Sequence, residues 1–289
     1  MRSGIFNLIV AFSLLVGCSE KSIVVEKPRE MQRAVSIQTI EDFGILLEKE
    51  IQQHNPHDIL VVFDFNYTLL YPADPALCKK NMEKHKVVFT KLLKTLSKKE
   101  ADLLFSNVTK TSNQKAVSNK SASLIRNFKK QGVNFIVCTG SLTKTGEKNS
   151  ADIIANLLKV HDIDLSSDAF PFAHLDFREF KSYLGSWPSY SNGIITANRE
   201  NKGAVLSSFM KKLEKKPEVV VFVDNSPKKI GDVLKIADSF AGVKFVVCKY
   251  DEYQNVAVPE ISEQEFLDFW NRKIAETKSL DVGKTLGIG

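Results

Sequence analysis

The sequence lacks the patterns that mark several large classes of protein. Only 4 cysteines and 5 histidines occur in 289 residues, with no CxxC pair and no Cys/His spacing of the kind that binds zinc. No repeat of fixed period runs along the chain, which excludes a solenoid or propeller. A hydrophobic fraction of 43% and a charged fraction of 26% are typical of an ordinary globular protein.

A strong excess of one charge is also missing. Forty Lys and Arg residues against 34 Asp and Glu give a net charge of +6. The surplus lysines gather at 78 to 100 and 211 to 218, where they alternate with apolar residues and indicate solvated helix faces. Because no recognition motif accompanies them, we expect no nucleic acid among the partners. Attraction to anionic lipid headgroups is a weaker alternative.

The first apolar run is too short to span a bilayer as a stable helix. Arg2 precedes an apolar stretch from Ile5 to Val16, and Gly17 and Cys18 follow it, which together predict an export signal over residues 1–17. The segment resembles a bacterial lipoprotein signal, which implies lipid attachment at Cys18 and a place in the cell envelope, facing the periplasm or on the outer membrane. A buried N-terminal helix is the alternative. Residues 18–36 would be the tether.

The remaining cysteines do not require a disulfide. Cys138 and Cys248 lie inside apolar, strand-like runs, and Cys78 lies in a Lys-rich helical pattern. Three cysteines cannot all pair, so we expect at least two of them to be small buried apolar residues.

Near-continuous apolar runs predict the fold class. They occupy 59 to 65, 133 to 139, 193 to 197, 219 to 225 and 243 to 248, with helical patterns between most of them. Such strands are typical of a parallel sheet covered on both faces, so we predict an α/β, three-layer, Rossmann-like core over 37–72 and 131–270. A helical pattern from 37 to 51 should precede the first strand.

Two connections are too long for simple crossovers. Residues 73–130 carry helical patterns, one opened by a capping box at Ser97 and Glu100, and predict an inserted helical cap. The second connection, 140 to 192, contains a predicted helix at 149 to 160 and an aromatic-rich region whose pattern does not resolve into elements. Its aromatic residues favour a packed layer over a substrate cage. Residues 271–289 are predicted to be a C-terminal tail.

Polar residues stand where several predicted strands end. Asp64 and Asn66 follow the first strand, Thr139 ends the second, and Asp224 ends the fourth. Lys202 begins a predicted helix. Because ligands bind at the carboxyl ends of parallel strands, these residues predict a site. Each also has a structural reading: an aspartate can cap a turn, Thr139 can be a strand residue and Lys202 a solvated lysine.

These segments together resemble the haloacid dehalogenase superfamily of hydrolases. The motifs are "DFNYT", "FIVCTG", Lys202 and "VFVDN", in that order. Within that superfamily, "GIITANRENKGAVLSSF" followed by "VVVFVDNSPKKI" is most similar to the DUF2608 family of bacterial exported proteins. The likeness runs from about residue 37 to residue 269.

The resemblance implies a mechanism and a cofactor. Asp64 would be the nucleophile that attacks a phosphoryl group. Mg²⁺ would be held by the Asp64 carboxylate, the main-chain carbonyl of Asn66 and Asp224. Phosphate would be bound by Lys202, the Thr139 hydroxyl and the amide of Gly140, a residue that directly follows the second strand. The expected substrate is a small phosphorylated or anionic molecule.

The chain departs from the superfamily's pattern at Asn66, where phosphatases carry a second aspartate as general acid and base. An amide can do neither, which costs roughly 10²- to 10⁴-fold in rate. Asn225 removes a further acid beside Asp224 and should weaken magnesium binding. Three interpretations stay open: a slowed phosphomonoesterase, an enzyme of the same fold with non-phosphatase chemistry, and a phosphate-binding lipoprotein without turnover.

Overall fold

The computed structural model describes residues 34–165, 170 and 172–285, with the backbone alone for 279–285. The predicted signal peptide, Cys18 and most of the predicted tether lie outside these residues. The strands are β1 (Val35–Ile37), β2 (Ile59–Phe63), β3 (Leu70–Pro72), β4 (Gln114–Ala116), β5 (Asn134–Thr139), β6 (Lys144–Thr145), β7 (Lys148–Asn149), β8 (His174–Asp176), β9 (Ser189–Ser191), β10 (Ile194–Thr196), β11 (Val219–Asp224) and β12 (Lys244–Tyr250). The helices are α1 (Ile40–Ile51), α2 (Lys79–Lys84), α3 (Lys86–Leu93), α4 (Lys98–Thr111), α5 (Ser121–Lys130), α6 (Ser150–Val160), α7 (Lys202–Lys212), α8 (Pro227–Ala237) and α9 (Glu263–Thr285).

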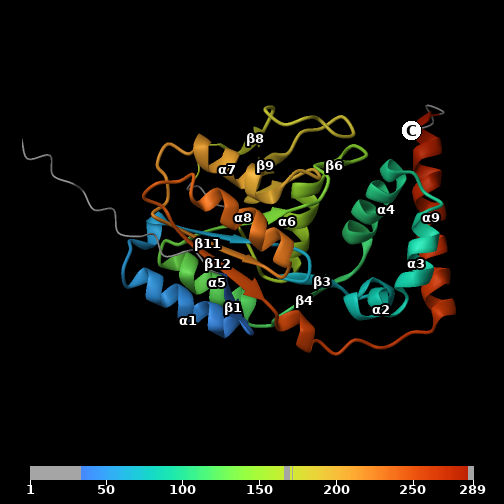
Figure 1. Ribbon diagram of the computed structural model, residues 1–289, viewed down its shortest axis with the longest axis horizontal. Helices are drawn as coiled ribbons and strands as arrows, with labels where there is room; N and C mark the ends of the chain where they lie inside the picture. Colours follow the sequence, from blue (N-terminus) through green and yellow to red (C-terminus); the bar gives the residue numbers. More distant parts are fainter. Residues whose placement is uncertain (1–33, 166–169, 171, 286–289) are drawn as a thin grey trace, which may run out of the picture. The chain divides into compact units, whose positions relative to one another are not determined.

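A mostly parallel sheet forms the centre, which confirms the predicted α/β class (Figure 1). Its eight strands run in the order β1-β12-β11-β2-β5-β10-β9-β8. All neighbours from β1 to β10 pair in parallel, and β9 and β8 add antiparallel pairs at one edge. Val61 is opposite Val221 on one side and Phe135 on the other, so β2 lies in the interior of the sheet.

Both faces of the sheet are covered by helices. Along β2, Val61 and Phe63 belong to the core that also contains residues of α1, α5 and α6, whereas Leu60 and Val62 belong to the core shared with α7 and α8. Side chains alternate between the two faces of a strand, so a strand buried on both faces has to be apolar throughout. This is the physical reason for the continuous apolar runs.

A second group of helices stands apart from the sheet and is called the helical subdomain below: α2, α3, α4 and α9 (Figure 1). Its core contains Phe89 of α3, Leu104 of α4 and Trp270 of α9, with the rings of Phe89 and Trp270 4.5 Å apart. The predicted capping box of α4 is confirmed, since the Glu100 amide donates to Ser97 Oγ over 3.2 Å and the Ser97 amide donates to Glu100.

The helical subdomain is assembled from two separate stretches of chain. The predicted cap, 73–130, includes α2, α3 and α4 but also α5, whose Ile125 and Phe128 pack in the core of the sheet. Residues of α9, which the sequence analysis placed in the core and the tail, pack instead against α3 and α4. The apolar side of α9, with Phe266 and Trp270, finds its partner there and not on the sheet.

The region that the sequence pattern left unresolved contains a β-hairpin. Asn192 and Gly193 join β9 to β10 with φ of 52° and 78°, the left-handed conformations of a two-residue type I′ turn. A Cβ at Gly193 would lie 2.3 Å from the carbonyl oxygen of Leu165, so glycine is needed for two reasons. Nearby, the rings of Tyr190 and Phe209 contact each other in a tilted arrangement with centroids 5.0 Å apart, as part of an aromatic layer.

Ile37 belongs to β1 and not to the first helix, which begins at Ile40 after its own capping box of Thr39 and Asp42. The three described cysteines are free and buried, as expected of small apolar residues: Cys78, Cys138 and Cys248.

Candidate functional site

Asp64 and Asp224 meet at the carboxyl edge of the sheet because β2 and β11 are adjacent parallel strands. Asp64 directly follows β2, and its amide donates to the carbonyl of Val223 over 2.8 Å. Asp224 is the last residue of β11 and is fully buried, and Asp64 is 8% exposed. The fold therefore removes two carboxylates from water at one point, which is unfavourable unless cations accompany them.

Lys202 supplies such a cation. Its ammonium donates to Asp224 Oδ2 over 2.8 Å and to Asp64 Oδ1. Lys202 is 3% exposed and is the first residue of α7, a helix end where a positive charge is electrostatically disfavoured. Its position is therefore explained by the two carboxylates and not by the stability of the helix.

Two carboxylates, Asp64 and Asp224, and the ammonium of Lys202 together carry one net negative charge. Burial and the neighbouring Asp224 charge raise the pKa of Asp64 from 3.8 to about 6, against the opposing effect of Lys202. Burial alone would lower the pKa of Lys202, but Asp64 and Asp224 outweigh it and hold that pKa above its usual range. A further cation at this point would compensate the remaining charge.

Thr139 and Gly140 approach the same point from β5. Thr139 is buried, and its hydroxyl lies 3.1 Å from Ser141 Oγ. Gly140 follows it, and a Cβ at Gly140 would meet no atom within 4 Å. The loop after β5 is therefore open where a ligand would lie.

Asn66 and Asn225 form a hydrogen-bonded pair beside Asp64. The Asn225 side-chain amide donates to the Asn66 carbonyl over 2.7 Å and to Thr68 Oγ1 over 3.3 Å. On its other side, Asn225 Oδ1 accepts from Lys79 of α2 over 2.9 Å. Asn66 Oδ1 is buried and has no hydrogen-bond partner among the described residues. An unpartnered buried oxygen is costly and indicates a missing donor or cation.

The groups at this point are oxygen donors of low total negative charge, and such donors suit a hard cation. No group of three or more His, Cys, Asp or Glu side chains that could hold a metal occurs within the described part of the chain. Two carboxylates, the Asn66 carbonyl and the unpartnered Asn66 oxygen remain. Mg²⁺ is commonly bound by one or two carboxylates with several waters, so the chemistry of these donors fits Mg²⁺.

All six described residues predicted for the site line one cavity of about 310 Å³: Asp64, Asn66, Thr139, Gly140, Lys202 and Asp224. Residues that the sequence analysis did not single out complete it. From α4 come Asp102, Phe105, Ser106 and Thr109, and from the core come Arg199 and Lys229. The cavity thus lies between the sheet edge and the helical subdomain.

Asp102 of α4 connects the helical subdomain to the core. Its buried carboxylate accepts from the Tyr183 hydroxyl over 2.8 Å and pairs with Nη2 of Arg199. Lys98, one turn earlier on α4, is 3.5 Å from the same carboxylate. Contacts with Tyr183 and Arg199 fix the position of α4 over the cavity.

Backbone strain directs Arg199 toward Asp102. Asn198 and Arg199 have φ of 47° and 74°, a conformation that non-glycine residues seldom adopt and that costs about 1–3 kcal/mol each. Asn198 offsets this cost with three hydrogen bonds: it accepts from Thr143 and donates to the carbonyl of Ser186, both buried, and it donates to the partly buried carbonyl of Tyr183. Strain of this kind is concentrated at functional sites.

A buried lysine lies behind the cavity wall. Lys110 of α4 donates to the hydroxyls of Ser106, Thr145 and Ser150, the first over 2.7 Å. Burial lowers the pKa of Lys110 to about 7. The lysine thus joins α4 to β6 and α6 through neutral hydroxyls.

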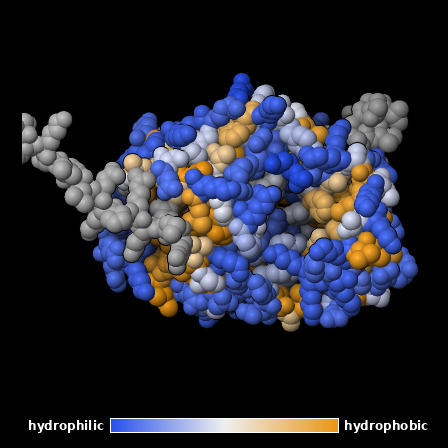
Figure 2. All heavy atoms as spheres, viewed as in Figure 1, coloured by the Kyte–Doolittle hydropathy of each residue, from blue (hydrophilic) through white to orange (hydrophobic). Residues whose placement is uncertain are grey.

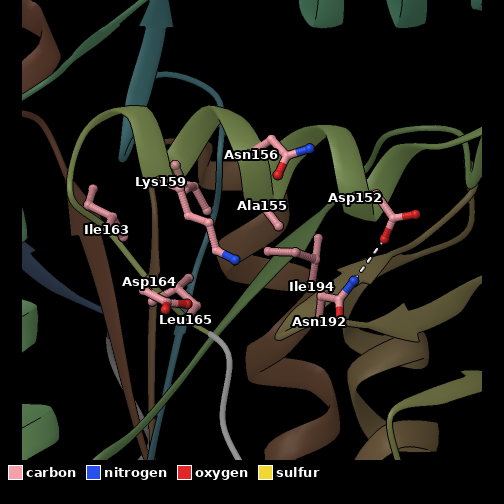
Figure 3. A pocket seen from close by; sticks show the side chains of 10 residues that line it. Asp152, Ala155, Asn156, Lys159, Ile163, Asp164, Leu165, Asn192 and Ile194 are labelled. Carbon is pink, nitrogen blue, oxygen red and sulfur yellow. Dashed lines mark hydrogen bonds between the residues drawn. The ribbon is translucent and has the colours of Figure 1, made fainter.

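A second cavity, of about 270 Å³, lies beside α6, and neither Asp64 nor Asp224 lines it. Figure 3 shows its lining, where Asn192 donates to Asp152 over 2.8 Å. Lys159 and Ile163 also line it, but none of the predicted site residues does.

Residues 37–274 match the family described as "Protein of unknown function (DUF2608)". The chain belongs to the DUF2608 family. It is also similar to an uncharacterized protein of Rickettsia bellii (strain RML369-C), at 23% identity over 216 residues, which cover 71% of this chain and 72% of the relative.

Hydrophilic residues cover most of the face shown in Figure 2, with hydrophobic ones in smaller patches. Lysines of α2 and α3 such as Lys80 and Lys86 are well exposed, as predicted for solvated helix faces. Among the described residues, no helix has the length and apolar character needed to cross a bilayer.

Proposed function

We propose that this DUF2608 protein is a Mg²⁺-dependent hydrolase of the haloacid dehalogenase type that acts on small phosphomonoesters. The observation that carries the proposal is the contact of the Lys202 ammonium with both Asp64 and Asp224 in a cavity that Thr139 and Gly140 also line. A nucleophilic carboxylate, a fixed cation and a hydroxyl beside an open backbone turn are the groups that phosphoryl transfer requires.

Each residue has a role in the proposed reaction. An oxygen of Asp64 attacks phosphorus and forms an aspartyl-phosphate, which water then hydrolyses. Lys202, the Thr139 hydroxyl and the Gly140 amide bind the phosphoryl oxygens and stabilise charge that develops on them. Asp64, Asp224 and the Asn66 carbonyl would hold Mg²⁺, which supplies the charge that lets an anionic nucleophile approach an anionic phosphate.

Asn66 limits the rate of this reaction. An amide can orient a water or a leaving group by hydrogen bonds, but it cannot donate a proton to an alkoxide. We therefore expect slow turnover, lower by roughly 10²- to 10⁴-fold than with an acid at this position, for leaving groups that need a proton.

The test is release of 4-nitrophenol from 4-nitrophenyl phosphate with and without Mg²⁺. Asp64→Asn should abolish release, and Asn66→Asp should raise it for poorer leaving groups such as phenyl phosphate. Asp58→Asn is the matched control, since Asp58 is a buried carboxylate at the opposite end of β2. Activity that persists in Asp64→Asn would refute the assigned nucleophile.

Phosphate binding without turnover is the second candidate. Asn66 and Asn225 stand where acids are expected, and this favours the second candidate because an amide carries no charge; the Asn225 amide donates to the Asn66 main-chain carbonyl. This candidate gains if beryllium fluoride and Mg²⁺ bind but Asn66→Asp turns over no substrate. Tight binding of the phosphate analogue would then be the function of the cavity.

We further propose that the protein acts in the bacterial cell envelope, tethered by lipid at Cys18. The support is the short apolar run of residues 5–16 followed by Gly17 and Cys18.

A further inference from the structure

Among the described residues that line the cavity, no carboxyl or phenol group is placed to give a proton to a departing alcohol. Of its carboxyl groups, Asp64 is the proposed nucleophile, Asp224 is paired with Lys202, and Asp102 is paired with Arg199. Tyr67 donates its hydroxyl to the carbonyl of Leu77 over 2.7 Å, and burial raises its pKa above the usual range. Asn66 carries an amide. The lining therefore favours a leaving group that departs without a proton.

The same cavity offers cations where an anion could depart. Arg199 and Lys229 line it together with Lys202 and are separate from the pair of carboxylates that Lys202 contacts. Lys229 lies in the first turn of α8, a helix end that also favours negative charge. Its ammonium is 3.8 Å from Asp232, a loose ion pair.

Contacts within the protein hold the Arg199 side chain in place. Strained backbone at Asn198 and Arg199, fixed by the buried Asn198 amide, positions the side chain, and Asp102 contacts one nitrogen, Nη2. A guanidinium has five N–H donors, so one carboxylate leaves others able to bind a second anion. The side chain of Arg199 is 46% exposed, so a ligand can reach it.

We propose that the cavity acts on phosphoryl compounds whose leaving group departs as an anion, an acyl phosphate or a phosphoanhydride, with Arg199 as the counter-ion of that group. The proposal rests on the phosphoryl transfer of the proposed function and differs from it in the preferred substrate, which is an anhydride and not a phosphomonoester of an alcohol. An Asp64 oxygen bonds to phosphorus, the bond from phosphorus to the leaving oxygen breaks, and that oxygen keeps the electron pair as a carboxylate or phosphate. Water then attacks phosphorus, the bond to Asp64 breaks, and the proton of the water passes to the phosphate product or to solvent.

The test is kcat/KM with Mg²⁺ for acetyl phosphate, inorganic pyrophosphate, phenyl phosphate and glycerol 3-phosphate, corrected for spontaneous hydrolysis. Wild type should prefer acetyl phosphate or pyrophosphate over glycerol 3-phosphate by about 10²- to 10⁴-fold, the value of a general acid. In Asn66→Asp this preference should shrink to about tenfold or less, because the new carboxyl group can protonate an alkoxide. Turnover of acetyl phosphate alone, or of pyrophosphate alone, assigns the leaving group as carboxylate or phosphate.

Variants of Arg199 test its role separately. Arg199→Met should lower kcat/KM for the preferred substrate by about 10- to 100-fold, as expected for a charge-assisted hydrogen bond, with phenyl phosphate little affected. Arg126→Met is the matched control, an exposed arginine of α5 outside the cavity. Arg199→Lys, which keeps a positive charge at this position, should lose less of kcat/KM for the preferred substrate than Arg199→Met, and so separates loss of the counter-ion from a folding defect.

Two results would overturn the proposal in different ways. Equal kcat/KM for all four substrates, unchanged in Asn66→Asp, would refute the substrate class and leave the hydrolase intact. An absence of phosphate release from every substrate, in wild type and in Asn66→Asp, would refute the proposed function itself.

Discussion

Replacing Asp64 with asparagine should make the protein more stable and inactive. The isosteric change removes one charge from the buried set of Asp64, Asp224 and Lys202, which leaves one carboxylate opposite one ammonium. The raised pKa of Asp64 means that the folded state holds its proton more tightly than the unfolded chain does. Wild-type stability attributable to Asp64 is therefore present below pH 3.8 and is lost as the pH rises to about 6.

The magnitude follows from the shift. A difference of about two pKa units corresponds to roughly 3 kcal/mol at most. Because Lys202 loses one of its two partners in the variant, we expect a net gain of about 1–3 kcal/mol at pH 8. For a chain of this size that gain raises Tm by roughly 2–10 °C, and it should approach zero near pH 4.

The assay is thermal unfolding of wild type and Asp64→Asn from pH 4 to pH 8, followed by circular dichroism, with and without Mg²⁺. Mg²⁺ should raise the Tm of the wild type more than that of the variant, since a ligand that binds only the folded state stabilises it. Asp58→Asn, which loses the ion pair with Lys215, should gain no stability at any pH. A variant less stable than the wild type at pH 8, or a difference independent of pH, would refute the account of the site's charge.

Three further predictions follow from single residues. Lys202→Met leaves two buried carboxylates without their cation and should destabilise the protein by about 3–5 kcal/mol at pH 8, less toward pH 5, in urea unfolding; a loss that does not vary with pH contradicts this. Burial lowers the pKa of Lys110 to about 7, so the unfolded state binds more protons above that pH and wild-type stability should rise with pH from about 7 to 10, whereas that of Lys110→Met should not; parallel pH profiles would refute it. Cys18→Ala should abolish labelling by radioactive palmitate in a bacterial host, and label that persists would exclude lipid attachment at Cys18.

Local sequence was sufficient to predict the five main strands of the sheet and the edge where their polar residues meet. The five apolar runs correspond to β2, β5, β10, β11 and β12, because strands buried on both faces must be apolar throughout. The hairpin of β9 and β10 was missed although Asn192-Gly193, followed by Ile194 and Ile195, is a strong hairpin signal. The short strands β1 and β8 carry three residues each, too few for a periodic pattern.

The helical side of the cavity could not be predicted in this way. Asp102 contacts Tyr183, which is 81 residues away, and Trp270 packs against Phe89 across an even longer separation. The amphipathic pattern of α9 shows that one side must be buried but not against which element. Arg199 reaches Asp102 from a backbone with positive φ, a conformation that has no sequence signature in a non-glycine residue.

The sequence by itself determined the five main strands of the sheet and the edge where Asp64 and Asp224 meet, because continuous apolar runs identify buried parallel strands and the rules of their connection leave few arrangements of strand ends. Tertiary structure alone decided that α4 and α9 form one helical subdomain and that Asp102, Arg199 and Lys229 complete the cavity. These contacts join residues far apart in the chain, and their free energy depends on shape and charge complementarity that arises only after the elements have packed.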